Sequence, residues 1–182
     1  ENSLVQLRAL LQNPLHLPRD YQFKRIEGYD VSNTSGLQAV VSMVVFTNGE
    51  IDKSQYRSFN IKTLNTPNDY QMLQEALLRR VQHQEWDEPS LLLIDGGKGQ
   101  VRKVWQALQN TRWQQLPLIG LAKDPDRVVI PIIEKDKIIN WEIASLTSDN
   151  LALQLLQQIR DEAHRFGKSR HVRRREKQLL GI

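Results

Sequence analysis

Two aspartates follow apolar stretches at places where an α/β protein often carries its reactive groups. Asp95 ends the apolar segment 90–95 and precedes two glycines, and Asp30 ends the alternating segment 23–31. Open α/β sheets bind ligands at the carboxyl ends of their strands. If the two segments are parallel neighbouring strands, the carboxylates lie side by side, where each raises the pKa of the other. A divalent cation between them would remove that repulsion, and oxygen ligands suit Mg²⁺ or Mn²⁺.

Each aspartate also has a purely structural interpretation. Asp is a favourable helix N-cap, so Asp95 could cap the helix that we expect after it. Asp30 precedes the small polar residues 32–36 and could form an Asx-turn. The two glycines after Asp95 favour a functional role, because they let the backbone approach another group closely. The residues alone leave capping and function open for Asp95.

The glycines and lysine of LLLIDGGKGQ, at 91–100, do not form a nucleotide-binding loop. A Walker loop needs the spacing G-x-x-x-x-G-K-[ST], but this segment is too short and no Ser or Thr follows Lys98. A dinucleotide-binding loop needs G-x-G-x-x-G, but Arg102 stands at the third glycine position. Lys98 could therefore contact a nucleic-acid backbone or simply begin a helix in solvent.

His164 lies in the segment IRDEAHRF, at 159–166, on a predicted helix. A histidine on a helix is more commonly a surface residue than a ligand. Here Arg160 and Asp161 lie one turn earlier, the helix has an apolar face, and a basic segment follows. These surroundings favour a metal ligand or a general base. Asp69, near the start of another predicted helix, is most simply an acid that satisfies free amides of the first turn.

The apolar pattern predicts a three-stranded meander followed by alternating helices and strands. Asn48-Gly49 indicates a tight hairpin within the meander. A meander followed by βα units gives a mixed sheet. We therefore predict an α/β fold with a mixed five-stranded sheet flanked by helices, and a small peripheral β-hairpin. The expected elements are helix 3–12, strands 23–31, 37–46 and 53–62, helix 67–84, strand 90–95, helix 99–112, strand 117–123, hairpin strands 128–133 and 137–143, and a final helix that starts after a cap at Ser148 or Asp149 and ends near 166.

The composition excludes several classes of protein. The 182 residues are 40% apolar and 25% charged, which is typical of a globular domain. There is no cysteine, so disulfides and thiolate metal sites are excluded. No apolar run approaches the roughly 18 residues of a membrane span, and the first residues do not form a signal peptide. A first residue Glu1 in place of Met suggests a piece of a longer chain.

Positive charge is concentrated near the end of the chain. The net charge is +4, while the segment 160–178 alone carries eight bases and three acids. A focused basic segment indicates a polyanionic partner, nucleic acid first, although a solvated basic tail would look the same. We expect a helix and linker at 1–22, the main domain at 23–166 and a basic tail at 167–182.

The chain resembles the C-terminal endonuclease domain of UvrC, the nuclease subunit of bacterial nucleotide excision repair. The resemblance covers nearly the whole chain, and IDGGKGQ and IRDEAHRF are long and specific. The matching segments occur in the family's order: RIEGYDVSNTSG at 25–36, YRSFNIK at 56–62, NDYQML at 68–73, LLLIDGGKGQ at 91–100, LIGLAK at 118–123 and LQLLQQIRDEAHRF at 153–166.

This resemblance implies an RNase H-like fold and a metal-dependent cut in a damaged DNA strand, on the 5′ side of the lesion. By motif, Asp30, Asp95 and His164 correspond to the catalytic set that binds Mg²⁺ or Mn²⁺, and Asp69 corresponds to a further functional acid. The implied partners are damaged double-stranded DNA and, in the full-length protein, UvrB. The implied location is the bacterial cytoplasm, and we expect the fragment to be a monomer.

The chain departs from the family in identifiable ways. Asn33 stands where the family usually has His. The helix-hairpin-helix pair that normally follows residue 182 is outside this chain, as are the N-terminal nuclease that makes the 3′ cut and the segment that binds UvrB.

Several side chains are candidates to contact DNA phosphates, which position a strand without reading its sequence. Lys98 and Arg160 would offset charge in the transition state. The further candidates for phosphate contacts are Tyr56, Arg57, Lys62, Arg165, Arg173 and Arg174.

Two other functions remain open. One is a non-catalytic DNA-binding module on the same fold. The other is a different RNase H-like nuclease for RNA hybrids or junctions, which would lack IRDEAHRF.

Overall fold

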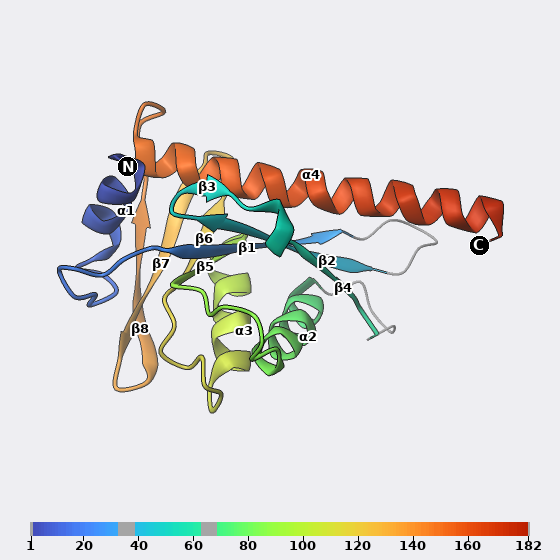
Figure 1. Ribbon diagram of the computed structural model, residues 1–182. Helices are drawn as coiled ribbons and strands as arrows, with labels where there is room; N and C mark the ends of the chain where they lie inside the picture. Colours follow the sequence, from blue (N-terminus) through green and yellow to red (C-terminus); the bar gives the residue numbers. More distant parts are fainter. Residues whose placement is uncertain (1, 33–38, 63–68, 182) are drawn as a thin grey trace.

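Eight strands form one mixed sheet in the part of the chain that the computed structural model describes, residues 2–32, 39–62 and 69–181 (Figure 1). The strand order is β3-β2-β1-β5-β6-β7-β8, and β4 also pairs with β2. β1 is parallel to β5 and β5 to β6, whereas the other pairs are antiparallel. The strands are β1 Arg25–Ser32, β2 Val40–Thr47, β3 Glu50–Ile51, β4 Arg57–Asn60, β5 Leu91–Asp95, β6 Leu118–Ala122, β7 Arg127–Glu134 and β8 Lys137–Ala144.

The predicted mixed sheet with flanking helices is confirmed, and the sheet is larger than five strands. The expected hairpin, β7 and β8, lies at the edge of the sheet but is joined to it, because β7 pairs with β6 from Gly120↔Val129 to Ala122↔Arg127. The Asn48-Gly49 turn is also confirmed, with φ of 52° and 83° at the two residues. The third predicted strand, 53–62, is shorter than expected, since the 3₁₀-helix Lys53–Gln55 occupies its first residues.

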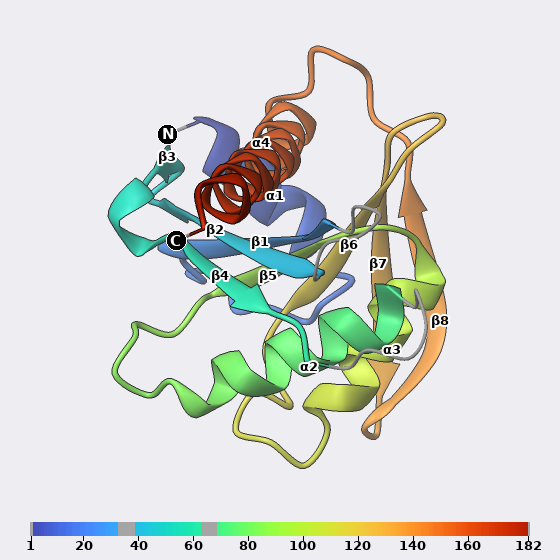
Figure 2. The same cartoon turned by 90° about the vertical axis from the view of Figure 1, so that its right-hand side faces the viewer.

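Helices cover both faces of the sheet (Figures 1 and 2). α1 and α4 pack on one face, and α2 and α3 pack on the other. Alternation along the strands divides the apolar side chains between two cores: Ile26 and Leu93 face α4, while Tyr29 and Ile94 face the other layer. The helices are α1 Asn2–Leu11, α2 Asp69–Gln82, α3 Lys98–Leu108 and α4 Leu151–Leu180.

The last helix differs from the sequence prediction at both ends. Its N-cap is Asn150, whose side chain accepts a hydrogen bond from Leu153 N at 3.0 Å, and not Ser148 or Asp149. The helix does not end near 166 but continues to Leu180, where Gly181 adopts a left-handed conformation. Thirty residues make a rod of about 45 Å. Its basic C-terminal part extends beyond the sheet (Figure 1).

No helix among the described residues is long and apolar enough to cross a membrane.

Candidate active site

Asp30 and Asp95 stand side by side on the sheet. β1 and β5 pair in parallel up to Tyr29↔Ile94, and each aspartate is the next residue of its strand. Alternation directs both carboxylates to the α4 face, because Ile26 and Leu93 on the same sides of the strands belong to the core under α4. The condition on which the sequence argument rested, that these segments are parallel neighbours, is met.

Helix α4 brings His164 to this pair of acids. The helix crosses β1 closely at Gly28, where an added Cβ would lie 2.4 Å from Ile159 Cγ2. One turn further along, His164 Nδ1 is 3.3 Å from Asp30 Oδ2. The His164 side chain is 58% exposed, whereas that of Asp30 is 9% exposed. The more exposed imidazole therefore lies against Asp30 on its solvent side.

The electrostatics of Asp30 are those of a crowded, desolvated carboxylate. Burial is the largest cause that raises its pKa, and the charge of Asp95 raises it further, against a lowering effect of His164. The result is a shift from 3.8 to about 6. Charging Asp30 beside Asp95 is thus unfavourable in the protein alone, and a bound cation would favour the charged form.

The donor set fits a hard divalent cation, since it offers carboxylate oxygens from two strands and an imidazole nitrogen from a helix. Within the described ranges, no three His, Asp or Glu side chains already stand close enough to hold an ion. Asp30 and Asp95 would provide the first two ligands. The largely exposed imidazole of His164 has room to turn towards an ion beside them.

The capping interpretation of Asp95 is wrong. The N-cap of α3 is Gly97, a residue without a side chain that could cap the helix. Gly96 adopts φ of +148°, a conformation that L side chains rarely reach, and its N–H donates to Leu121 O at 3.0 Å. The loop after β5 is therefore fixed by its backbone, which leaves the half-buried carboxylate of Asp95 available on the α4 face. Asp30 lies inside β1 opposite Ser42, and the strand continues past it.

A family profile described as "UvrC RNAse H endonuclease domain" matches residues 12–167 of the chain. The chain belongs to this family. Curated relatives named UvrABC system protein C include those of Dehalococcoides mccartyi, 43% identical over 186 residues, and Methanococcoides burtonii, 43% identical over 183 residues. These matches cover 98% and 97% of this chain but only 29% and 28% of the relatives. The chain thus spans less than a third of the length of these relatives.

Solved structures support the fold assignment. The catalytic domain of human endonuclease V has a TM-score of 0.53 and 15% identity, and the match covers 100% of this chain and 99% of that one. An endonuclease V of Ciona intestinalis, solved with a 24mer DNA that contains an inosine, has a TM-score of 0.51 and 16% identity, and the match covers 95% of this chain and 99% of that one. At this identity the likeness shows the fold alone, which is RNase H-like.

Two positions that the family resemblance singled out fall at or beyond the edge of the described structure. Asp69 is the first residue of α2, but its side chain lies outside the described part, and Asn33 lies outside it entirely. Tyr70, in the first turn of α2, reaches the first turn of α3, because its hydroxyl would be 2.8 Å from a Cβ added to Gly99. The first turns of α2 and α3 are therefore linked through the Tyr70 side chain, and Asp69 is the residue before Tyr70.

Two of the predicted phosphate-binding arginines form ion pairs within the protein. Arg160 contacts Asp126 at 2.8 Å and Asp161 at 3.1 Å. Arg165 makes two hydrogen bonds to Glu162, and Glu162 also accepts one from the Tyr56 hydroxyl at 3.0 Å. Both guanidinium groups would have to leave an acid, or share it, to reach DNA.

The other predicted contacts are spread over the surface. Lys98 is exposed in the first turn of α3, three residues after Asp95 in the chain. Arg57 lies over the Trp86 ring at 4.9 Å, and Lys62 is exposed just after β4. Arg173 is exposed on the extension of α4. The side chain of Arg174 lies outside the described part.

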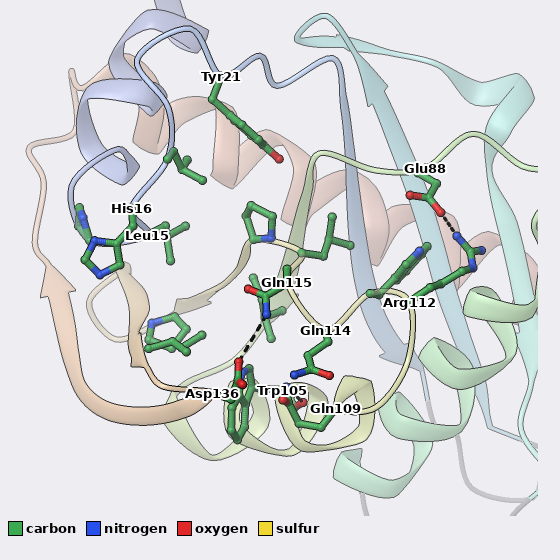
Figure 3. Close-up of a pocket in the computed structure, with 18 of the residues that line it drawn as sticks. Leu15, His16, Tyr21, Glu88, Trp105, Gln109, Arg112, Gln114, Gln115 and Asp136 are labelled. Carbon is green, nitrogen blue, oxygen red and sulfur yellow. Dashed lines mark hydrogen bonds and ion pairs between the residues drawn. The ribbon is translucent and has the colours of Figure 1, made fainter.

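A cavity of about 520 Å³ lies at the opposite end of the parallel strands, near the starts of β5 and β6 (Figure 3). Two pairs of side chains join charged and polar groups of its lining: Arg112 with Glu88, and Gln115 with Asp136 at 3.4 Å. Each of its two acids thus has a basic or amide partner, whereas Asp30 faces Asp95. The chemistry of this cavity therefore does not compete with that of the carboxylate pair.

Proposed function

We propose that the chain is the metal-dependent DNA endonuclease unit of a nucleotide excision repair nuclease. Its reaction would be hydrolysis of a phosphodiester in the damaged strand, on the 5′ side of a lesion. The observation that carries this proposal is the pair of adjacent carboxylates, Asp30 and Asp95, with His164 in contact with Asp30. Membership of the UvrC endonuclease domain family supports the same assignment.

Asp30 and Asp95 hold Mg²⁺ or Mn²⁺ in this scheme. When bound, such an ion polarises the phosphate and lowers the pKa of an attacking water. Asp30 orients the imidazole of His164 through the contact at Nδ1. His164 then completes the site as a ligand or accepts the proton of the water. Asp69 would contribute as a further acid from the start of α2.

The basic surface near the site would hold the DNA backbone. Lys98 is exposed three residues after Asp95, and Arg173 is exposed on the α4 extension. Side chains of this kind position a strand through its phosphates and give binding a steep dependence on salt. Arg160 and Arg165 would contribute less, because their acidic partners already neutralise them. In the complete protein, we propose damaged duplex DNA as the substrate and UvrB as a partner.

Nicking of a duplex with one bulky lesion tests this proposal. The damaged strand is end-labelled, and the chain and the full-length protein with UvrB are assayed in Mg²⁺, Mn²⁺ or EDTA. We expect a metal-dependent cut on the 5′ side that Asp95→Asn abolishes. The exposed Asp20 provides a matched control, since Asp20→Asn should nick like the wild type.

Two results would count against the scheme. If Asp95→Asn in the full-length protein still nicked in Mg²⁺, the acidic pair would not be the active site. If the wild-type chain bound no Mn²⁺, and neither it nor the full-length protein nicked, the chain would be a DNA-binding module on an RNase H-like fold.

A further inference from the structure

Ser42 is a polar residue in the middle of an otherwise apolar strand. β2 reads VVSMVVFT, and Ser42 is fully buried within it. Its hydroxyl has no hydrogen-bond partner among the described residues. A buried hydroxyl without a partner costs roughly 1–3 kcal/mol. An alanine or valine at this buried position would make β2 more stable, so stability does not explain the serine.

The neighbours of Ser42 supply that reason. Ser42 is the direct cross-strand partner of Asp30, and both side chains project to the α4 face. Directly opposite residues of an antiparallel pair have Cβ atoms about 5 Å apart. Above them, α4 presents Gly167, which leaves a small gap. A Cβ at that position would lie 3.0 Å from Ser42 Oγ and 3.8 Å from Asp30 Oδ2.

A charged Asp30 needs hydrogen-bond donors on the oxygen lone pairs that no metal uses. Carboxylates that bind metals are normally held by such partners, and loss of a partner typically reduces metal affinity or activity about 10–100-fold. His164 contacts Asp30 through Nδ1, and this contact would be lost if the imidazole bound the metal through that nitrogen. Ser42 Oγ is a second donor on the same face, and no described residue engages it.

We propose that Ser42 is a positioning residue for Asp30. Its hydroxyl donates to the Asp30 carboxylate, directly or through one water under Gly167, and so holds the carboxylate in the orientation that binds the divalent cation. This inference rests on the proposed function, since it assigns Ser42 to the metal site formed by Asp30 and Asp95.

The test measures Mn²⁺ affinity by calorimetry and unfolding in EDTA for the intact chain and its variants. Ser42→Ala should weaken Mn²⁺ binding about 10–100-fold and slow nicking to match. It should also leave the metal-free protein as stable as the wild type or more stable, because it removes a buried unpaired hydroxyl. Ser42→Thr keeps the hydroxyl and should restore binding.

Ser58 provides the matched control. Its Oγ is also buried and without a partner among the described residues, and it lies opposite Ser42 on β4, one strand further from Asp30. Ser58→Ala should leave Mn²⁺ affinity unchanged. Three results would each overturn the role of Ser42. The Ser42→Ala variant could bind Mn²⁺ as tightly as the wild type, or Ser58→Ala could lose as much Mn²⁺ affinity as Ser42→Ala. The loss of Mn²⁺ affinity could also parallel a loss of stability in the metal-free protein.

Asp95→Asn separates this inference from the proposed function. If the wild type binds Mn²⁺ more tightly than Asp95→Asn while Ser42→Ala matches the wild type, only the role of Ser42 fails. If Asp95→Asn binds Mn²⁺ as tightly as the wild type, the metal site itself fails, and the role of Ser42 fails with it.

Discussion

Replacement of Asp30 by Asn should stabilise the metal-free protein at neutral pH while it abolishes cleavage. The pKa of Asp30 is raised from 3.8 to about 6, mainly by burial and then by the charge of Asp95. A shift of about two units corresponds to roughly 3 kcal/mol of unfavourable charging at pH 7.5. Asn keeps the shape of the side chain and removes that charge. The free energy of unfolding of the metal-free protein should therefore rise by most of this amount.

The sign of the effect depends on pH. Between pH 3.8 and about 6, folded Asp30 binds more protons than unfolded Asp30, so wild-type stability falls as pH rises through this window. Near pH 4 the carboxyl is protonated in the folded protein, and the advantage of Asp30→Asn should be small. At pH 7.5 it should be largest, with a rise in Tm on the order of 5–10 °C for a protein of this size.

The difference in stability between the wild type and Asp30→Asn is measured by urea and thermal unfolding in EDTA, at several values of pH between 4 and 7.5. The exposed Asp20 is the control, because Asp20→Asn should change stability by no more than about 0.5 kcal/mol at any of them. Added Mn²⁺ should raise the wild-type Tm by mass action and leave Asp30→Asn unchanged. A variant that is no more stable than the wild type at pH 7.5, or a difference that is constant with pH, would refute the reasoning.

Three further outcomes follow from the structure. His164→Ala should abolish nicking yet change the free energy of unfolding by less than about 1 kcal/mol, because the side chain is 58% exposed; a large loss of stability would contradict this. Glu27→Gln should lower the free energy of unfolding in urea by about 3–5 kcal/mol. The reason is that fully buried Glu27 accepts hydrogen bonds from Arg80, Arg25 and Tyr29. An unchanged free energy of unfolding would show that the buried charge is not needed. Arg173→Ala should weaken duplex binding and reduce the slope of log affinity against log salt by about one, with no change in metal affinity; an unchanged slope would remove Arg173 from the DNA contact surface.

Local patterns in the sequence were enough to predict most of the sheet. Alternation and apolar runs predicted β1, β2, β5 and β6, and Asn48-Gly49 predicted the hairpin turn. The end of α4 was missed because residues 167–180 have no apolar face from which to recognise a helix. A usable signal was present, since Arg, Lys, Gln and Glu favour helices and Gly181 is a typical residue just past a helix end.

The interior charges were not predictable in the same way. Glu27 sits in the strand segment RIEGYD and receives Arg80 from α2, 53 residues away, at 2.8 Å. Arg160 of α4 forms an ion pair with Asp126, in the loop before β7. Such ion pairs depend on which elements pack together, and no periodicity in one segment carries that information.

The sequence by itself determined the chemistry available to this protein. It placed Asp95 at the end of a buried strand, put His164 on a helix with an apolar face, and excluded a nucleotide loop by spacing. Only the tertiary structure decided that Asp30 and Asp95 are neighbours, that Gly97 and not Asp95 caps α3, and that Ser42 lies buried against Asp30. The physical reason is that residue type and periodicity act over a few residues, whereas strand register joins groups 65 residues apart in the chain.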